Sequence, residues 1–430
     1  MAESINKRIR KRTYYEIGIK TISPLNIGNG DSYETDADVL RNSSGDVFVP
    51  GTSLAGAFRN YHEVKKNEKG IYGFSSDEDG RMSSLFISDL YFETEGQDLS
   101  VRDMVSLTEE KSVENKFDGE ILERGAQGKI QIELVERDGD PEDGSHMVED
   151  LICAIEQGEI RFGSKKNRGY GRLTVESVSV ISFTKEDRQE WIDFLTQNKE
   201  FQGPLKSYEE WKKGITIPEK KYIKVVVPLK LTGGISIRRY STQPGKADYE
   251  QLTSKGVPVI PGSSWNGAIR HDAKRILREL GMKQEKAEQY IDSWFGNVKT
   301  KEDTNARQSM IVISESILKD AVAVPMTRNK INRFTAGTKD GALYTELSYF
   351  GGTTELEYMI PKEEIEDCRK IIAIMEIVVK DIAKGYVAIG GQTAVGRGIF
   401  EGIGEPQYSE NIDKEKCMNE FYGVIIGGAV

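Results

Sequence analysis

One twelve-residue pattern occurs twice in this chain. It reads VPGTSLAGAFRN at residues 49–60 and IPGSSWNGAIRH at residues 260–271. Each copy follows a run rich in β-branched and aromatic residues, at 14–28 and at 222–234, which predicts a strand. Each copy continues into apolar residues at helical spacing. Whatever fold the first copy adopts, we therefore expect the second copy to adopt it as well.

A second motif repeats in the same order. Both halves end in a G-x5-G-x-G loop that leads into a strand-like run, GSKKNRGYGRLTV at 163–175 and GGQTAVGRGIFEG at 390–402. A helical pattern precedes each loop, near 147–157 and about 363–384, and Gly385 stands where a helix C-cap is expected. Two motifs in one order at similar separation indicate an internal duplication.

The order of the predicted elements in each half is β-α-β-β-α-β. This order predicts an α+β protein with two tandem ferredoxin-like (RRM-like) domains, each carrying an inserted hairpin segment. We predict a first domain at 1–182, a helical connector at 183–220, and a second domain at 221–430, whose tail after about residue 406 is unassigned. Such sheets are common platforms for RNA, although a fold alone proves no function.

Composition narrows the classes of function. The formal net charge of −10 argues against a general nucleic-acid coat but allows basic residues to gather on one face. No apolar run is long enough to span a membrane and no signal peptide is recognisable, so we expect a cytoplasmic protein without membrane contact. Neither a disulfide framework nor a zinc cluster is expected from the scattered Cys153, Cys368, Cys417, His62, His146 and His271.

The helix start in the first motif is a candidate phosphate site. Proline and glycine turn the chain out of a strand, and the Ser/Thr pair is predicted to supply the helix N-cap. Free N–H groups and hydroxyls at a helix start suit phosphate, and Gly56 and Gly267 permit close approach. The plainer interpretation is a well-capped helix packed tightly on its sheet. The glycine loop is neither a Walker loop nor a Rossmann fingerprint, because it precedes a strand and no Lys-Ser/Thr follows it.

Taken together, the two motifs on a duplicated ferredoxin-like plan resemble the RAMP superfamily of CRISPR systems. The resemblance covers residues 14–180 and 222–402 and is greatest to the backbone subunits of type III effector complexes. The segment 327–360 is similar to the part of those subunits that carries a hairpin thumb. The resemblance implies three kinds of partner: a guide (CRISPR) RNA, a target RNA, and other subunits of a type III CRISPR effector complex.

The resemblance also implies a catalytic role for an aspartate in the loop before the motif helix. Asp36 aligns best with that aspartate in the first half, and Asp248 takes the equivalent place in the second half. Oxygen ligands suit Mg²⁺, which can neutralise charge on a scissile phosphate while a ribose 2′-hydroxyl attacks in line. We therefore expect Mg²⁺, or another divalent cation, to be held at Asp36 and Asp248. The alternative is that these loop aspartates are solvated or cap a turn.

RNA contacts are implied at the helix starts, the glycine loops and the thumb segment. The residues concerned are Thr52, Ser53, Arg59, Ser263, Ser264, Arg270, Gly163, Lys165, Lys166, Arg168, Gly169, Gly171, Arg172, Gly390, Gly396, Arg397, Gly398, Arg328, Lys330 and Arg333.

Three alternatives stay open at this point. The chain could be a backbone subunit that binds RNA without cutting it, because both aspartate loops depart from the usual family pattern. It could be a guide-processing RAMP endoribonuclease, although neither aspartate loop contains a histidine. It could also be an unrelated RRM-like protein that binds single strands without partner subunits.

Overall fold

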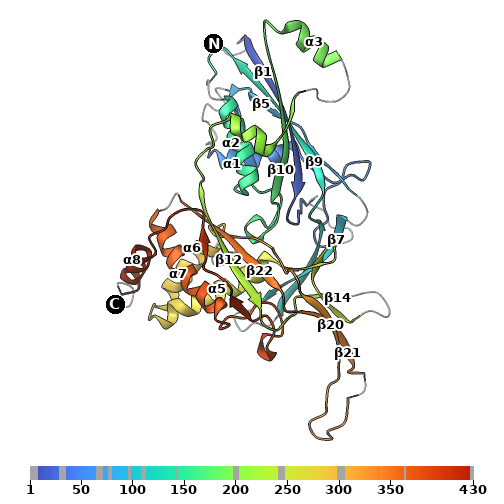
Figure 1. The fold of residues 1–430 in the computed structure, drawn as a ribbon, viewed down its shortest axis with the longest axis vertical. Coiled ribbons are helices and arrows are strands. Elements are labelled where there is room, and N and C mark those ends of the chain that lie inside the picture. Colours follow the sequence, from blue (N-terminus) through green and yellow to red (C-terminus); the bar gives the residue numbers. More distant parts are fainter. Residues whose placement is uncertain are drawn as a thin grey trace. The chain divides into compact units, whose positions relative to one another are not determined.

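A computed structural model describes the chain at 8–28, 35–63, 71–75, 80–94, 98–107, 113–140, 144–196, 203–240, 247–297, 306–339, 341–362 and 365–426. Contacts within the chain divide it into two compact units (Figure 1). The first unit comprises Met1–Val101, Phe117–Lys166 and Gly171–Lys220. The second comprises Arg102–Lys116, Asn167–Tyr170 and Lys221–Val430.

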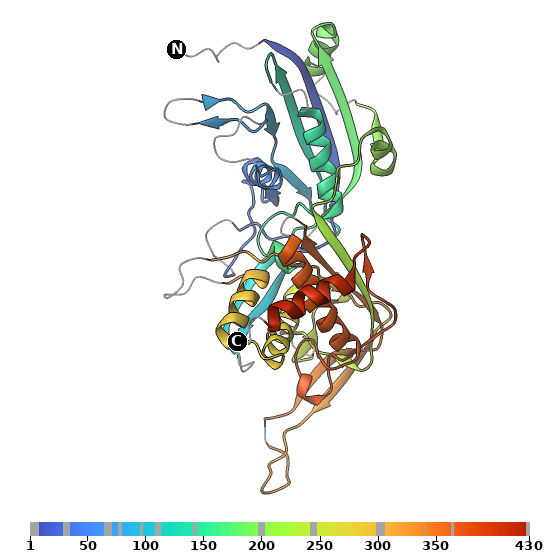
Figure 2. The same ribbon diagram turned by 90° about the vertical axis from the view of Figure 1, so that its left-hand side faces the viewer.

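The first unit is built on one antiparallel sheet of order β11-β10-β1-β9-β6-β2, with β5 also paired to β9. Its strands are β1 (Ile9–Thr21), β2 (Phe48–Val49), β5 (Leu85–Ile87), β6 (Leu90–Glu93), β9 (Gln127–Arg137), β10 (Leu173–Thr184) and β11 (Leu205–Ser207). From Thr13 to Thr21 the side chains of β1 alternate between buried and half-buried, as the period of a strand requires. Its buried face packs against α1 (Gly51–Tyr61) and α2 (Gly144–Gln157), and Figure 2 shows α2 (teal) lying along the strands.

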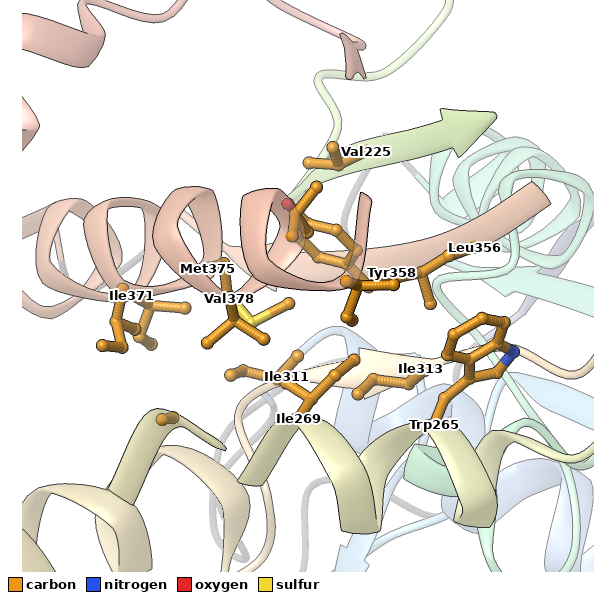
Figure 3. Packing of buried hydrophobic residues seen from close by; sticks show 14 of the residues in the cluster. Val225, Trp265, Ile269, Ile311, Ile313, Leu356, Tyr358, Ile371, Met375 and Val378 are labelled. Carbon is orange, nitrogen blue, oxygen red and sulfur yellow. The ribbon is translucent and has the colours of Figure 1, made fainter. Parts of the chain in front are cut away.

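The second unit repeats this plan. Its main sheet has the order β18-β22-β12-β23, and β24 also pairs with β12. The strands are β12 (Tyr222–Leu231), β18 (Val312–Ile313), β22 (Thr353–Pro361), β23 (Phe400–Gly402) and β24 (Gln407–Tyr408). The core lies between this sheet and two helices, α5 (Gly262–Glu279) and α7 (Ile365–Ala383). Figure 3 shows Trp265 of α5 facing Leu356 of β22, and Ile269 of α5 facing Met375 and Val378 of α7.

The predicted ferredoxin-like plan is confirmed in both halves. A β-α-β-β-α-β unit has four strands. In each sheet the first and third of these strands lie in the centre, and the second and fourth lie outside them. The correspondence holds residue by residue: Ile22 N–H donates to the Arg172 carbonyl, and Thr232 N–H donates to the Ile399 carbonyl at the same place in the other sheet. The predicted C-cap also holds, since Gly385 follows α7 with φ +77°.

The segments predicted as connector and tail pack onto the units beside them. After β10 come α3 (Arg188–Thr196), β11, α4 (Tyr208–Trp211) and η3 (Lys212–Gly214). Tyr208 and Trp211 are buried in the core of the first unit, and Ser207 closes a capping box with Glu210. The tail forms β24 and α8 (Lys414–Ile426), whose Cys417 and Phe421 are buried in the core of the second unit.

Each half carries an inserted hairpin. The hairpins are β7 (Leu99–Leu107) with β8 (Val113–Leu122), and β20 (Val322–Arg328) with β21 (Tyr344–Phe350). The second hairpin projects from the body of its unit, as Figure 2 shows in orange. The remaining elements are β3 (Phe74–Ser75), β4 (Gly80–Arg81), β13 (Gly234–Ile235), β14 (Arg238–Tyr240), β15 (Tyr249–Gln251), β16 (Thr253–Ser254), β17 (Val257–Ile260), β19 (Ser316–Ile317), α6 (Gln284–Phe295), η2 (Lys166–Arg168) and η4 (Thr393–Val395).

Candidate nucleic-acid interface

The two motif helices begin two residues earlier than an N-cap at Thr52 or Ser263 implies. Pro50 and Pro261 occupy the N-cap positions, and neither helix start has a side-chain cap hydrogen bond. The expectation that Ser or Thr caps these helices is therefore wrong, because the Pro-Gly pair starts the helix before the hydroxyl residues are reached. In the first unit the Gly51 N–H instead donates to Asp89 Oδ1 at 2.7 Å, from the turn between β5 and β6.

Thr52, Ser53, Ser263 and Ser264 consequently lie within the first helical turns. Thr52, Ser53 and Ser263 are exposed and Ser264 is half-buried. Their hydroxyls stand at the positive end of a helix dipole, where anions are stabilised.

The two glycines of each motif have different surroundings. A Cβ at Gly51 would lie 2.5 Å from the Ile87 carbonyl oxygen, and one at Gly262 would lie 2.4 Å from the Ile313 carbonyl oxygen. These glycines let the helix start pack against a strand. Gly56 and Gly267 are exposed, and a Cβ at either would meet no atom within 4 Å. Among the residues that the structure describes, no packing contact requires glycine at either position, and the space around the Cβ position is open.

The glycine loops share one backbone shape. Gly171 and Gly398 have φ of +77° and +72°, and a Cβ at these residues would lie 1.8 Å and 1.9 Å from the carbonyl oxygens of Phe162 and Ile389. Gly163 and Gly390, at the loop starts, also have positive φ. These four conformations require glycine for structural reasons.

One residue in each loop adopts the left-handed conformation despite its side chain. Lys165 has φ +53° and its counterpart Gln392 has φ +57°. Gln392 Nε2 donates to Glu346 Oε2 at 2.9 Å. Burial raises the pKa of Glu346, but hydrogen bonds from Ser348, Gln392 and Ser236 outweigh it and hold the pKa below its usual value. This buried carboxylate ties the second glycine loop to the hairpin strand β21.

In the first unit the motif helix and the glycine loop meet at a pocket of about 570 Å³. Its lining includes Ser53, Gly56, Asn60, Arg161, Gly163 and Lys166. Hydroxyl, amide and basic groups thus converge beside an exposed helical glycine, a combination suited to a phosphate-bearing ligand. Among the predicted residues, the structure brings Ser53, Gly163 and Lys166 together here.

Arg161 and Asn60 were not predicted from the sequence. Arg161 is 5% exposed, and its guanidinium donates to the carbonyls of Gly158 and Lys166. The sequence did offer a signal for Arg161, because this basic residue stands two positions before Gly163, the first glycine of the loop. The matching place in the second half is Ala388, so the first loop is the more basic of the two.

The two motif arginines have structural partners. Arg59 donates to the Gly73 carbonyl at 3.4 Å, and Arg270 donates to the Gly296 carbonyl at 2.6 Å and pairs with Asp292. Because the contacts match, both arginines hold in place a segment that follows their helix. Contact of either arginine with RNA stays a prediction.

The arginines near the loop glycines also make contacts within their own units. The Arg172 backbone N–H donates to Ser23 Oγ at 2.9 Å. The Arg397 guanidinium lies 4.6 Å from the centre of the Phe350 ring and donates to Met326 Sδ. Arg397 is thereby placed at the root of the β20–β21 hairpin.

Residues Asn167–Tyr170 belong to the second unit. Asn167 Nδ2 donates to the Ser309 carbonyl at 2.8 Å, and a Cβ at Gly169 would lie 2.6 Å from the Glu315 nitrogen. The Arg168 carbonyl lies against Gly262 at the start of α5. Arg168 and Gly169 were predicted to bind RNA; the structure places the Arg168 carbonyl against a helix start and Gly169 against the backbone at Glu315. Gly396, the counterpart of Gly169, is exposed and has no atom within 4 Å of a Cβ position.

The two predicted catalytic aspartates occupy matching places. Asp36 and Asp118 each donate a backbone N–H to the other's carboxylate, at 2.9 and 3.0 Å. The Thr345 N–H donates to Asp248 Oδ2 at 2.7 Å. Asp36 and Asp248 are both exposed. Asp36 is hydrogen-bonded to β8 of the first hairpin, and Asp248 is hydrogen-bonded to β21 of the second. Asp118 is a second carboxylate that the sequence did not single out.

The donor sets differ between the repeats. Mg²⁺ is commonly held by one or two carboxylates together with substrate phosphates. Asp36 with Asp118 fits this donor set, whereas Asp248 faces Thr345 and offers one carboxylate. Within the described ranges no group of three or more His, Cys, Asp or Glu side chains is placed to hold a metal ion. Residues 29–34, just before Asp36, lie outside those ranges.

The predicted thumb residues lie on or beyond the β20–β21 hairpin. Arg328 ends β20, and Lys330 and Arg333 follow it as exposed residues. Phe334, nearby, is fully exposed at 100%. An exposed aromatic flanked by cations suits insertion between bases.

Comparison with protein families agrees with this architecture. The family profile of the RAMP superfamily matches residues 18–174 and 222–401, one match in each repeat. The chain therefore belongs to the RAMP superfamily, and this membership implies a CRISPR-associated, RNA-binding subunit. No curated protein matches the chain. In the part of the chain that the structure describes, no helix is long and apolar enough to cross a membrane.

Proposed function

We propose that this protein is a guide-RNA-binding backbone subunit of a type III CRISPR ribonucleoprotein, located in the cytoplasm. The observation that carries the proposal is the pocket in the first unit, where the helix start and the glycine loop converge on one space. Both motifs recur in the second unit, so one chain would hold two successive segments of guide. The acidic net charge is compatible with this role because the pocket itself is lined by two basic residues, Arg161 and Lys166, and by no acidic residue of the described chain.

Filling the pocket should weaken guide binding without unfolding the protein. Gly56→Gln places a side chain in the pocket, and its Cβ meets nothing within 4 Å. Glutamine favours helix over glycine, so the free energy of unfolding should rise by about 0.5–1 kcal/mol. Guide affinity, measured by filter binding, should nevertheless fall about tenfold or more, because the glutamine side chain fills the space that the RNA backbone would occupy.

The matched control is Gly423→Gln. Gly423 lies in α8, is exposed, and likewise has no atom within 4 Å of a Cβ position. This variant should gain similar stability and bind guide normally. Unchanged binding by Gly56→Gln would contradict the assigned site.

Guide binding by the wild-type protein should also depend on salt. For about five phosphate contacts, its guide affinity should fall on the order of 100-fold between about 50 and 200 mM salt.

The finer part of the proposal is cleavage of guide-paired target RNA. Asp36 and Asp118 in the first repeat, and Asp248 in the second, would hold a divalent cation such as Mg²⁺, which neutralises charge on the scissile phosphate when bound. Backbone N–H groups of β8 and β21 orient these carboxylates. The ribose 2′-hydroxyl attacks the adjacent phosphorus, giving a 2′,3′-cyclic phosphate and releasing the 5′-oxygen of the next nucleotide.

Asp36→Asn and Asp248→Asn should each abolish one cut in a bound target while leaving guide affinity unchanged. The amide keeps the shape of the carboxylate but removes the charge that a cation needs. Cuts are mapped on end-labelled target with Mg²⁺ and with EDTA. If both variants keep every cut, the aspartates are not catalytic; if the wild type makes no cut, the protein is a non-catalytic backbone. Cutting of repeat RNA in EDTA would instead support a guide-processing endoribonuclease.

A further inference from the structure

One carboxylate of the second unit is buried and takes no part in the chemistry proposed above. Glu346, in β21, is 1% exposed. Ser348 donates its hydroxyl to Glu346 Oε1 at 2.7 Å, and Gln392 donates its Nε2 to Glu346 Oε2 at 2.9 Å. The hydroxyl of Ser236 donates to the same carboxylate. A buried charge is costly unless hydrogen bonds compensate it, and here the compensation comes from three separate segments, which the carboxylate thereby joins.

Gln392 makes its contact with Glu346 at two costs. Its backbone is left-handed, with φ +57°, which is unfavourable for a residue with a Cβ. Its amide oxygen is buried and has no hydrogen-bond partner within the described part of the chain. The amide cannot turn round to relieve this, because a carboxylate only accepts hydrogen bonds and Nε2 is the group that donates. Strain of this kind persists where the surroundings impose one shape on a loop.

The contact fixes the middle of the second glycine loop. The start and the end of the loop are held by backbone hydrogen bonds, since the N–H groups of Gly391 and Gly398 each donate at 2.8 Å to a carbonyl within 234–236. Gln392 lies between these two anchors, directly before the exposed tip of the loop at 394–396. The buried carboxylate therefore sets the backbone from which that tip projects.

The first repeat lacks the residue that makes this contact. Strand pairing puts Leu122 of β8 and Tyr349 of β21 at equivalent places, opposite the segments that follow β1 and β12. Counting back three residues along each strand, Glu346 corresponds to Gly119. A glycine has no side chain with which to hold a loop, so the two repeats differ in how their loops are supported.

The charges of the two loops differ in the opposite sense. Residues 163–169 include three basic residues, whereas the matching residues 390–396 include none. Lys166 of the first loop also lines the pocket, together with Arg161. The first loop can therefore attract phosphates through charge, and the second gains little in this way. A preformed shape is the other route to affinity, because less conformational freedom is then lost on binding.

We propose that Glu346 is a positioning residue, which holds the second glycine loop in its RNA-binding shape before RNA arrives. The inference rests on the proposed guide-binding function and gives the two repeats different means of binding: charge in the first loop and prior ordering in the second. The carboxylate itself does not touch RNA, since it is almost fully buried. It acts through Gln392, whose backbone leads directly into the exposed tip of the loop.

Glu346→Gln should weaken guide binding about tenfold, and the direction of this change is informative. Loss of a negative charge would by itself strengthen binding to RNA. The positioning role predicts the opposite, because an amide has only one oxygen and cannot accept from Ser348 and Gln392 as the two carboxylate oxygens do. Filter binding at about 50 and 200 mM salt should show an unchanged salt slope, since no phosphate contact is lost, whereas Lys166→Gln should lower that slope by about 0.7.

Hydrogen exchange of the full-length protein, followed by mass spectrometry, shows where the variant loosens. Without RNA, peptides covering 390–398 should exchange about tenfold faster in Glu346→Gln than in the wild type. Peptides from β12 and α7 should keep the wild-type rate, which a general loss of stability would not allow. Gln392→Gly is the second variant: it removes the same hydrogen bond but relieves the left-handed strain, so it should fold and show the same local loosening.

Glu401→Gln is the matched control, because it removes the same charge from an exposed residue of β23. It should change neither exchange nor affinity. Unchanged exchange at 390–398 in both loop variants, or guide binding as tight as that of the wild type, would overturn the positioning role and leave the proposed function standing. Faster exchange throughout the second unit would also overturn it, since Glu346 would then be structural only. Absence of guide binding in the wild type would instead refute the proposed function, and the positioning role with it.

Discussion

An alanine at Gly398 should lower the free energy of unfolding of the second unit by about 3 kcal/mol or more. Its Cβ would lie 1.9 Å from the Ile389 carbonyl oxygen, and φ is +72°. The left-handed conformation alone costs an alanine roughly 1–2 kcal/mol. The overlap adds to this, because hydrogen bonds from Gly398 to Gly234 and from Ile389 to Gly398 hold the backbone on both sides. Urea unfolding followed by tryptophan fluorescence measures the loss.

Gly396→Ala separates the two contributions. Gly396 has φ +83° in the same loop, but a Cβ there would meet no atom within 4 Å. This variant should lose only roughly 1–2 kcal/mol. Gly171→Ala should repeat the larger loss in the first unit, since its Cβ would lie 1.8 Å from the Phe162 carbonyl oxygen. Equal losses at Gly396 and Gly398 would mean that backbone overlap is not what demands glycine.

The fold was predictable because the duplication doubles every local signal. Neither the strand pattern at 14–28 nor the PGTS sequence decides a fold alone. The same order of signals at 222–402 makes the β-α-β-β-α-β plan readable, and both sheets follow it. The membership of the RAMP superfamily is confirmed on the same residues that carried the resemblance.

The start of α1 was predicted wrongly because the acceptor of its first N–H is not local. Ser and Thr after Pro-Gly look like N-cap residues, yet the Gly51 N–H finds its acceptor on Asp89. A carboxylate from a distant turn has no signature in a local pattern. The same limit applies to the 167–170 segment, whose place in the second unit depends on contacts with Ser309 and Glu315.

The site was predictable only in outline. The family resemblance singled out Asp36 and Asp248 by their distance from the motif proline, and their catalytic role stays a prediction. Asp118 was missed because its hydrogen-bonding partner Asp36 is far away along the chain. Arg161 was missed although its contacts, with Gly158 and Lys166, are local. Asp118 lies in a charged stretch, VENKFDGE, where no periodicity distinguishes one carboxylate from another. Strand pairing is what selects it, and pairing partners are not visible in one sequence.

Glu315→Ala should destabilise the second unit by about 3–5 kcal/mol, the usual cost of leaving a buried charge without its partner. Glu315 forms a two-pronged ion pair with Arg102, and their side chains are 6% and 3% exposed. The Arg102 guanidinium also lies 6.0 Å from the centre of the Tyr170 ring. Removal of the carboxylate leaves that guanidinium buried opposite an apolar methyl group, and urea unfolding should report the loss.

A double replacement distinguishes the ion pair from mere packing. Arg102→Met with Glu315→Leu fills similar volume without charge, and buried pairs replaced in this way are often neutral or stabilised. The double variant should therefore recover most of the loss, whereas each single variant stays destabilised. As a reference, Glu420→Ala breaks a half-exposed pair with Arg369 and should cost no more than about 1 kcal/mol. If the double variant is as unstable as Glu315→Ala, charge burial does not explain the effect, and the shape of the Arg102 side chain is what holds residues 102–116 in the second unit.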